Sequence, residues 1–408
     1  MNRCRLLLLP LAAALVACAG EDTIDLNTGG STSTGPSFGG FGGAGCDGSS
    51  VDQDGDGYST EMGDCNDCDP SSSPGAVEVA GSGADEDCDG EIDEDESQGC
   101  DGGLLTDSLD PIDAARALDL CKTAEGDLGW GVVSARWAQM DGSDPPEGGL
   151  QRQRFDRGHG LVTDFGTTLV PRHGDGMLVL STGEARDLDD PQSTKGFGYA
   201  NPLIHKWYSC GPPDGFPKAV ASCQDQDPPL STGIASTDSI ALELEIRTPA
   251  NAHGFSFEHY YMLASWPFTC FELSPFLALL EPFPKQQFDG NIVFDATGDY
   301  IGQPATIRAC GCENGPPCPV FSVSQPPTDA LCPLGDADLL GTGFGRDGGM
   351  RGGGTGWQTT KAPVDPNSTI TLRLTIGQGG DVGWDATALI DNWRWLLDPG
   401  VVVQTTPQ

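Results

Sequence analysis

Hydrophobic and polar residues alternate along several stretches of the chain after residue 130, and this period of two predicts β-strands. The clearest stretch is Ile240–Ile246, which reads Ile-Ala-Leu-Glu-Leu-Glu-Ile, as a strand with one buried and one solvated face should. Comparable runs predict strands over Gly131–Trp137, Gly160–Phe165, Met177–Ser181, Ile240–Arg247, Phe255–Leu263, Gly290–Asp295, Ala305–Ala309, Thr369–Ile376 and Ala388–Trp395. Long connections rich in Pro and Gly separate them, at 141–158, 311–335 and 341–356.

One short helix precedes these strands. Asp110 is a suitable N-cap, and Pro111 suits the first helical position because its missing N–H would have no partner there. The segment 111–121 places its apolar residues on one face, namely Ile112, Ala115, Leu118 and Cys121. We therefore predict a mostly β protein, with an antiparallel, jelly-roll-like β-sandwich and one short helix over 102–398 and a tail at 399–408.

The first eighteen residues have the composition of an export signal. Two arginines precede an apolar run over 6–16, which is too short to span a bilayer comfortably. The Leu-Val-Ala-Cys sequence that ends at Cys18 resembles a bacterial lipobox, in which the cysteine is lipidated. We expect Cys18 to anchor an exported lipoprotein in the outer membrane or at the cell surface, with an ordinary cleaved signal peptide over 1–18 as the alternative. Residues 19–45, rich in Gly, Ser and Thr, are typical of a flexible tether.

The negative charge of the chain is concentrated in one segment. The net charge is −39, and residues 47–101 hold 19 acidic side chains with no Lys or Arg. This distribution argues against a basic face that binds nucleic acid, and it favours cation binding over a general surface property. An acidic disordered linker is the alternative. We treat residues 46–101 as a separate module, which has too few apolar residues for a core and needs ions or disulfides instead.

Two Asp-x-Asp-x-Asp-Gly runs in this module have the spacing of calcium loops. The first comprises Asp52, Asp54, Asp56 and Gly57, where the glycine permits a sharp turn. Tyr58, at the seventh position, would offer its backbone carbonyl. No helical pattern flanks either run, so these are predicted to be calcium loops without the helix pair of an EF-hand.

The second run begins at Asp85, and a third cluster of oxygen donors lies between the two runs. Dense carboxylate and amide oxygens are hard ligands, which favour Ca²⁺ over a transition metal, the alternative ion. The predicted metal ligands are Asp52, Asp54, Asp56, Tyr58, Asp64, Asn66, Asp67, Asp69, Asp85, Asp87, Asp89 and Asp93.

The 15 cysteines support export, because disulfides persist in oxidising compartments. Within the module, Cys65 is placed to pair with Cys88, and Cys46 with Cys100, which leaves Cys68 as the candidate unpaired thiol. Elsewhere, disulfides are expected between Cys210 and Cys223 and within the cluster Cys310, Cys312, Cys318 and Cys332, where a zinc site is the rival interpretation.

Residues 52–94 resemble the "putative metal-binding motif" family of bacterial surface proteins. The matching motifs occur in the family's order: Asp64-Cys65-Asn66-Asp67, then Pro74-Gly75-Ala76, then Asp87-Cys88-Asp89-Gly90. Two features depart from the pattern, since Cys68 replaces a variable residue and Gly81–Ala84 replaces an Asn/Asp-rich lead-in. The resemblance implies a metal-binding module whose second ligand set is incomplete.

Residues 104–397 resemble "choice-of-anchor L" domains. The resemblance lies in Ala114–Leu118, Trp130–Ala135, Met177–Gly183, Gly341–Phe344, Thr355–Trp357 and Ala388–Trp395. It implies a β-sandwich on a bacterial surface protein, without an established reaction. The family's usual acidic residue near position 378 is Gln378 here, which weakens the expectation of an ion site there.

Polar and aromatic residues near the last predicted strand have two interpretations. The carboxylates Asp381, Asp385 and Asp391 would cap turns or hold a structural calcium ion. The aromatic residues Trp384, Trp393 and Trp395 would pack in the core or stack on a sugar ring.

Recognisable catalytic motifs are missing from the sequence. The five histidines form no His-Glu-x-x-His motif, and no Gly-x-Ser-x-Gly elbow, phosphate loop or dinucleotide fingerprint occurs. Glu243 and Glu245 could form a carboxylate pair, although a solvated strand face explains them as well. We predict a non-enzymatic surface protein that binds or adheres to a glycan or protein ligand, with a secreted polysaccharide hydrolase or a transition-metal-binding surface protein as alternatives.

Overall fold

The structure is a computed structural model. It describes residues 50–94, 99–126, 128–187, 190, 193, 237–264, 274–285, 289–295, 298, 300–301, 306–310, 332–345, 352–378 and 385–408. All of these lie in one compact unit that spans residues 42–408. No helix among the described residues is both long enough and apolar enough to cross a membrane.

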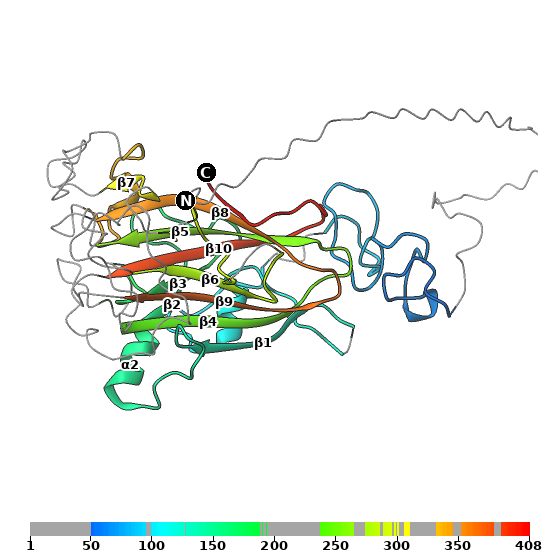
Figure 1. The fold of residues 1–408 in the computed structure, drawn as a ribbon, viewed down its shortest axis with the longest axis horizontal. Helices are drawn as coiled ribbons and strands as arrows, with labels where there is room; N and C mark the ends of the chain where they lie inside the picture. The colour runs from blue at the N-terminus through cyan, green and yellow to red at the C-terminus, as the bar shows by residue number, and fades with distance from the viewer. Residues whose placement is uncertain are drawn as a thin grey trace, which may run out of the picture. The chain divides into compact units, whose positions relative to one another are not determined.

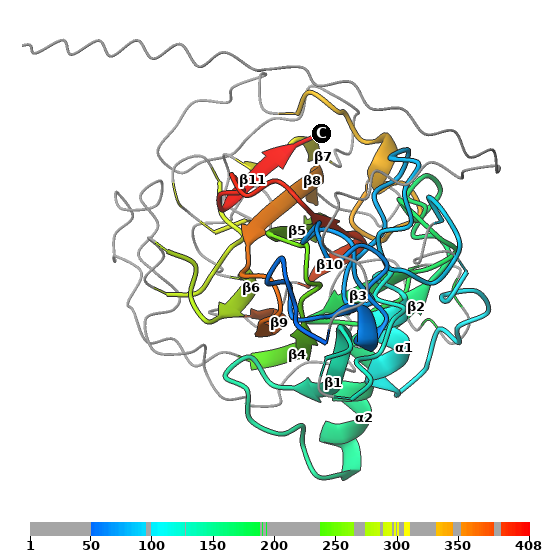
Figure 2. The same cartoon turned by 90° about the vertical axis from the view of Figure 1, so that its right-hand side faces the viewer.

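Two antiparallel sheets form the body of this unit, so the predicted β-sandwich is confirmed (Figure 1). The four-stranded sheet has the order β1-β4-β9-β6, with β1 at Gly131–Ala138, β4 at Thr237–Arg247, β9 at Thr369–Gln378 and β6 at Phe276–Glu281. The larger sheet has the order β11-β8-β5-β10-β3-β2, with β11 at Gln404–Pro407, β8 at Gly353–Pro363, β5 at Gly254–Leu263, β10 at Ala386–Leu396, β3 at Met177–Ser181 and β2 at His159–Val162. Figure 2 shows the two sheets as separate layers.

The main core lies between the sheets, and a second core covers the outer face of the larger sheet. Along β5, Phe255 and Phe257 point into the main core, whereas Tyr260 and Met262 belong to the second cluster. Every residue of β5 is therefore buried. Strands that are covered on both faces read as continuous apolar runs rather than as alternating ones, which explains the Met-Leu-Val-Leu-Ser sequence of β3.

The alternation in β4 sets one face against the main core and one against solvent. Its even-numbered apolar residues from Ile240 to Ile246 are buried, whereas Glu243 points outward. The Glu243 carboxylate accepts hydrogen bonds from Arg136 Nε on β1 and Arg373 Nε on β9, each at 2.7 Å. The solvated-face interpretation therefore holds for the exposed Glu245, whereas Glu243 is only 14% exposed and two cross-strand ion pairs occupy its carboxylate.

The helical prediction is partly correct. Helix α1 covers Pro111–Arg116, and the Asp110 side chain caps it by accepting a hydrogen bond from the Ile112 N–H at 2.9 Å. The helix ends at Arg116, earlier than residue 121, and a turn follows in which Asp119 has a φ of +69°. A second helix, α2 at Gly149–Arg157, lies within the segment 141–158 that was predicted to be a connection.

Several strand predictions need correction. Strands β6, β8 and β11 were not predicted, and the first four residues of β8 fall in the supposed 341–356 connection. The expected strand Gly290–Asp295 forms only isolated bridges. Of the expected strand Ala305–Ala309, the described residues 306–309 contribute only Ala309 to a strand, the two-residue β7, Ala309–Cys310, beside β8. Short 3-10 turns occur at η1, Thr60–Met62, and η4, Ala337–Leu339.

We predict that the Phe255→Ala variant loses about 3–5 kcal/mol of unfolding free energy, as expected for a large aromatic deletion in a packed core. Phe255 is fully buried, and its ring stacks on Trp393 with centroids 4.2 Å apart. Urea denaturation measures the change. Leu150→Ala on α2 is the control, because Leu150 is 60% exposed and its truncation should alter stability by less than about 0.5 kcal/mol. Equal stability losses in the two variants would contradict this assignment of the core.

Candidate metal centre

The first Asp run folds into a loop that its own carboxylates organise. Asp52 accepts hydrogen bonds from the Gly55 N–H at 2.6 Å and the Gly57 N–H at 3.0 Å. Asp54 Oδ1 accepts a hydrogen bond from the Asp56 N–H at 3.2 Å, and Asp56 Oδ1 accepts one from the Tyr58 N–H at 2.8 Å. Gly57 has a φ of +102°, a conformation that favours glycine. The spacing of the run therefore produces successive turns that bring its side chains to one side.

Two carboxylates of the first run converge with that of Asp64, which follows the run. Asp54, Asp56 and Asp64 each place an oxygen within 4.8 Å of the others. One oxygen of each side chain bonds to the backbone, whereas all three Oδ2 atoms are buried without a hydrogen-bond partner. Buried unpaired carboxylate oxygens are costly, and a cation at their meeting point is the simplest partner. This arrangement fits a bound metal ion.

The electrostatics of the first cluster agree with this geometry. Burial, assisted by the charges of neighbouring carboxylates, raises the pKa of Asp64 to about 6. Burial also raises the pKa values of Asp54 and Asp56. The carboxylates thus disfavour one another's charged forms when no cation is bound, and a cation would reverse that effect.

Asp67 supports the same loop from a neighbouring turn. Its Oδ1 accepts a hydrogen bond from the Gln53 N–H at 2.8 Å, and its Oδ2 accepts from the Thr60 hydroxyl at 3.3 Å. Asp67 also forms a second potential ligand group with Asp52 and Asp54. Both parts of the predicted ligand set, the first run and the Asp64–Asp67 cluster, therefore meet in space.

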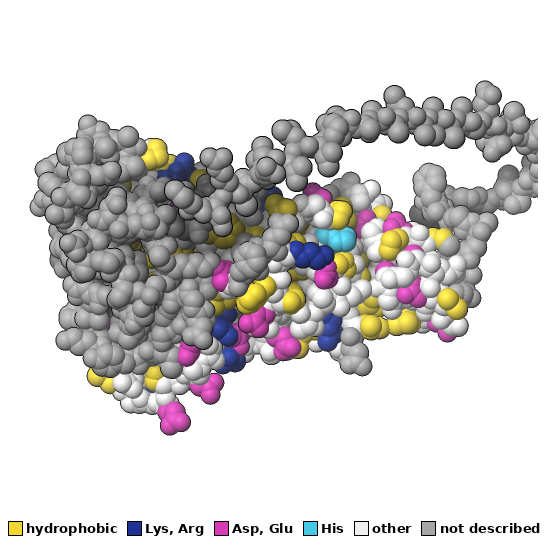
Figure 3. Space-filling view, in the orientation of Figure 1, with side chains coloured by type: hydrophobic (Ala, Val, Ile, Leu, Met, Phe, Trp, Pro, Cys, Tyr) yellow, Lys and Arg dark blue, Asp and Glu magenta, His cyan; other side chains and the backbone are white. Residues whose placement is uncertain are grey.

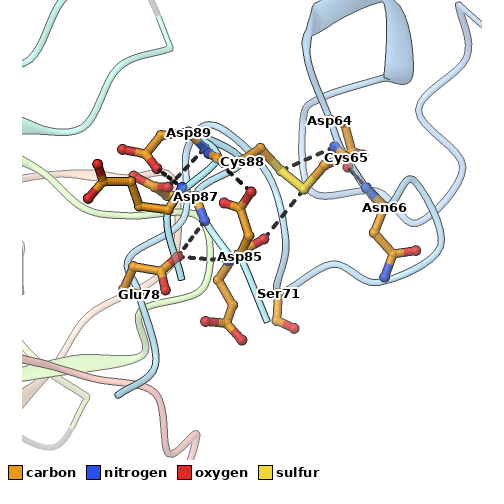
Figure 4. Close-up of a disulfide and its surroundings, with 12 residues drawn as sticks. Asp64, Cys65, Asn66, Ser71, Glu78, Asp85, Asp87, Cys88 and Asp89 are labelled. Atoms are coloured by element: carbon orange, nitrogen blue, oxygen red, sulfur yellow. Dashed lines mark hydrogen bonds between the residues drawn. A yellow bond between two sulfur atoms is a disulfide. The ribbon is translucent and has the colours of Figure 1, made fainter. Parts of the chain in front are cut away.

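The second Asp run repeats the hydrogen-bond pattern of the first. The Gly90 N–H donates to Asp85 Oδ2 at 3.1 Å, the Asp89 N–H donates to Asp87 Oδ1 at 3.1 Å, and Gly90 has a φ of +98°. Asp85, Asp87 and Asp89 form another potential ligand group. The predicted disulfide Cys65–Cys88 is confirmed and joins this loop to the turn that carries Asp64 (Figure 4).

Glu78 is a site residue that the ligand prediction missed. Its Oε1 accepts hydrogen bonds from the Glu86 and Asp87 N–H groups at 2.7 and 3.0 Å, and its Oε2 accepts from the Asp93 N–H at 3.0 Å (Figure 4). Glu78 also groups with Asp87 and Glu94, whose two carboxylate oxygens are buried without a hydrogen-bond partner. The sequence feature that could have identified Glu78 is its position, two residues after the Pro74-Gly75-Ala76 motif.

The remaining predicted ligands lie outside the four carboxylate groups found among the described residues. Asp69 is exposed and caps the Ser71 N–H, and Asp93 Oδ1 accepts from the Gly83 N–H at 3.2 Å. The Asn66 N–H donates to Asp64 Oδ1 at 2.7 Å. The Tyr58 side chain is buried, and its hydroxyl donates a hydrogen bond to the Leu128 carbonyl at 2.9 Å.

The module packs directly against the sandwich. Trp130 Nε1 donates to the Ala76 carbonyl at 2.8 Å, and the Ala250 N–H donates to the Gly75 carbonyl at 2.7 Å. Asn367 Nδ2, from the turn between β8 and β9, donates to the Asp56 carbonyl at 2.7 Å. Gly75 must be glycine, because a Cβ there would lie 2.4 Å from the Tyr58 ring. On the face seen in Figure 3, acidic side chains extend over the module.

The disulfides correct two predictions. Cys100 pairs with Cys121 rather than with Cys46, so this bridge ties the module to the segment that follows α1. Cys68 is disulfide-bonded and is not the unpaired thiol. A disulfide between Cys310 and Cys332 is confirmed. The proposed Cys210–Cys223 pair and the cysteines Cys312 and Cys318 lie outside the described residues.

Two residues of β10, Asp391 and Trp393, favour turn capping and core packing, respectively. Asp391 is fully buried and accepts hydrogen bonds from the Arg172, His173 and Asn392 N–H groups, so it caps two turns. Trp393 is buried in the core. Asp381 and Trp384 lie outside the described residues.

Comparisons with known proteins match the module alone. Residues 64–94 match the family model Cu-binding_MopE, described as "Putative metal-binding motif". This match supports a metal-binding motif in the segment that carries the carboxylate groups. No curated protein and no solved structure matches the chain. The resemblance of residues 104–397 to choice-of-anchor L domains therefore stays a prediction, as do the lipoprotein signal and the predicted domain boundaries.

We predict that the contribution of Asp64 to the stability of the metal-free protein falls as the pH rises from about 4 to 6. The Asp64 pKa is about 6 in the folded chain, against an ordinary value of 3.8, so the folded state holds a proton that the unfolded state releases in this window. Denaturation of dialysed protein at several pH values measures the slope. Asp64→Asn should remove this contribution and shift the slope toward greater stability at higher pH, whereas Asp69→Asn, at an exposed position, should leave the slope unchanged. An unchanged slope in Asp64→Asn would contradict the assignment.

Proposed function

We propose that the module binds Ca²⁺. The observation that carries this proposal is the convergence of Asp54, Asp56 and Asp64, each of which has a buried Oδ2 atom without a hydrogen-bond partner. Carboxylate oxygens are hard ligands suited to Ca²⁺, which takes six to eight oxygens at about 2.3–2.6 Å. The name of the matching family model indicates copper, but Cu²⁺ sites usually include imidazole nitrogen or sulfur ligands. The potential ligand groups among the described residues contain carboxylates only.

The proposed ion has a structural role. The loop that would hold it carries the Asp56 carbonyl that Asn367 of the sandwich binds. Ion binding should therefore stabilise the contact between the module and the sandwich as well as the loop itself. Calcium loops of extracellular modules bind with dissociation constants of about 10⁻⁴–10⁻³ M, so the site would be filled at extracellular calcium levels.

Calorimetric titration of the full chain with Ca²⁺ tests this proposal. We expect Asp56→Asn to weaken Ca²⁺ binding at the first cluster by about tenfold or more, because Asp56 is buried and supplies one of the three converging oxygens. Asp69→Asn is the matched control, since it neutralises an exposed carboxylate of the same module outside the ligand groups. Equal affinities in the two variants would place the ion elsewhere.

A parallel titration with Cu²⁺ separates calcium from copper. Divalent copper binds most donor sets more tightly than other first-row metals, so affinity alone is not decisive. The electron paramagnetic resonance spectrum of bound Cu²⁺ should lack nitrogen couplings if carboxylates are its ligands. Stoichiometric Cu²⁺ bound through nitrogen or sulfur, together with no heat from Ca²⁺, would overturn the calcium proposal.

We propose further that the whole protein is a lipid-anchored surface protein that binds or adheres rather than catalyses. The lipobox at Cys18, the tether at 19–45 and the lack of catalytic motifs in the sequence support this proposal. The carboxylate pair that would have favoured a hydrolase offers no support, because Glu243 is engaged by Arg136 and Arg373. The β-sandwich would then present the ligand-binding surface beyond the tether.

The anchor is tested by expressing the full chain in a bacterial host supplied with a labelled fatty acid. We expect the wild-type protein to carry the label and to sediment with the membrane fraction. Cys18→Ser should lose both properties, because serine lacks the thiol that receives the lipid. Label that persists in Cys18→Ser would contradict the proposal, and Cys4→Ser serves as the control within the same leader.

A further inference from the structure

A cleft of about 280 Å³ lies where the second acidic loop meets the end of β10. The module contributes Glu78 and Glu94 to its wall, and the sandwich contributes Lys122, Trp130 and Trp395. Its volume is close to the lower end of ligand pockets, roughly 300–1,000 Å³, and suits a group about the size of one sugar ring. The metal proposal does not account for the aromatic part of this cleft.

Tryptophan rings form two walls of the cleft at nearly right angles. Trp395 meets Trp130 edge to face, with ring centroids 6.2 Å apart and an interplanar angle of 87°. It meets Trp393 in the same way, at 5.3 Å and 80°. Trp393 in turn stacks on the core residue Phe255, which fixes the position of this corner. Rigid aromatic walls of this kind receive the apolar face of a ring at little entropic cost.

The polar part of the cleft is rich in hydrogen-bond acceptors. Asp93 and Asp119 join Glu78 and Glu94 in the lining, and the basic groups are Lys122 and Arg394. Lys122 Nζ lies 4.3 Å from the Trp130 ring centroid and 3.8 Å from Asp87 Oδ2, which connects the aromatic wall to the carboxylate cluster. A divalent ion at Glu78, Asp87 and Glu94 would bring the charge of the lining close to neutral.

We infer that this cleft binds a neutral saccharide, with a sugar ring packed against Trp395 and its hydroxyls donating to the lining carboxylates. Hydroxyl groups also complete the oxygen shell of a cation held by Glu78, Asp87 and Glu94, so saccharide binding depends on Ca²⁺. An anionic ligand is disfavoured because four carboxylates face two basic groups. This inference rests on the proposed calcium function and specifies the ligand class of the surface protein.

The test uses the full chain on an array of neutral and acidic oligosaccharides, in about 5 mM Ca²⁺ and again after chelation, since extracellular calcium loops bind at about 10⁻⁴–10⁻³ M. The strongest glycan is then titrated by calorimetry. Trp395→Ala should weaken its binding by about tenfold. Trp357→Ala, which removes a half-buried tryptophan on β8 outside the cleft lining, should leave it unchanged.

A second variant guards against a folding defect in Trp395→Ala. Asp93 lines the cleft, is exposed and has a φ of +59°, a conformation that asparagine tolerates well. Asp93→Asn should therefore fold normally, keep its Ca²⁺ affinity and weaken glycan binding.

The outcomes separate the two proposals. Calcium-dependent glycan binding that both cleft variants weaken supports the inference. If the chain binds Ca²⁺ normally but binds no oligosaccharide of the array, the inference is overturned and the calcium proposal stands. Glycan binding that survives chelation, or that Trp395→Ala and Asp93→Asn leave unchanged, also overturns it. A wild-type chain that binds no Ca²⁺ overturns the proposed function itself.

Discussion

Mutual repulsion between buried carboxylates is the constraint on which the acidic module depends. Asp54, Asp56 and Asp64 lie together, and each has one oxygen hydrogen-bonded to the backbone and one that is buried without a hydrogen-bond partner. Those backbone bonds hold the loop in its turns, so the side chains cannot move apart without losing them. The loop is thus organised in a form whose remaining electrostatic cost a bound cation would remove, and such a coupling would make folding of the module and ion binding interdependent.

The same constraint extends into the sandwich through specific contacts. Asp56, which supplies one of the converging oxygens, also presents its carbonyl to Asn367, and the adjacent Tyr58 packs on Gly75 and bonds to the Leu128 carbonyl. The Cys100–Cys121 bridge joins the module covalently to the segment after α1. A rigid module would therefore hold the tryptophan corner of β10 and the second carboxylate cluster in a constant relation, as a shared ligand site requires.

Sequence periodicity predicted the parts of the fold in which burial alone decides the pattern. Strand β4 alternates because one face is solvated, and β3 is a short apolar run because both faces are covered. Strand β8 escaped prediction because its first residues, Gly353-Gly354-Thr355-Gly356, are typical of a loop. It is a strand because β5 on one side and β7 and β11 on the other supply hydrogen-bond partners, and this long-range pairing is invisible in a local pattern.

The sequence by itself determined the turns of the acidic loops, because Asp at alternate positions followed by Gly satisfies nearby N–H groups locally. It also indicated the Cys65–Cys88 bridge and most of the carboxylates that converge. Only the tertiary structure decided that Glu78 organises the second loop, that Cys100 pairs with Cys121, and that the module rests on the sandwich. These outcomes depend on which distant segments meet, and the spacing of residues along a chain carries no record of such contacts.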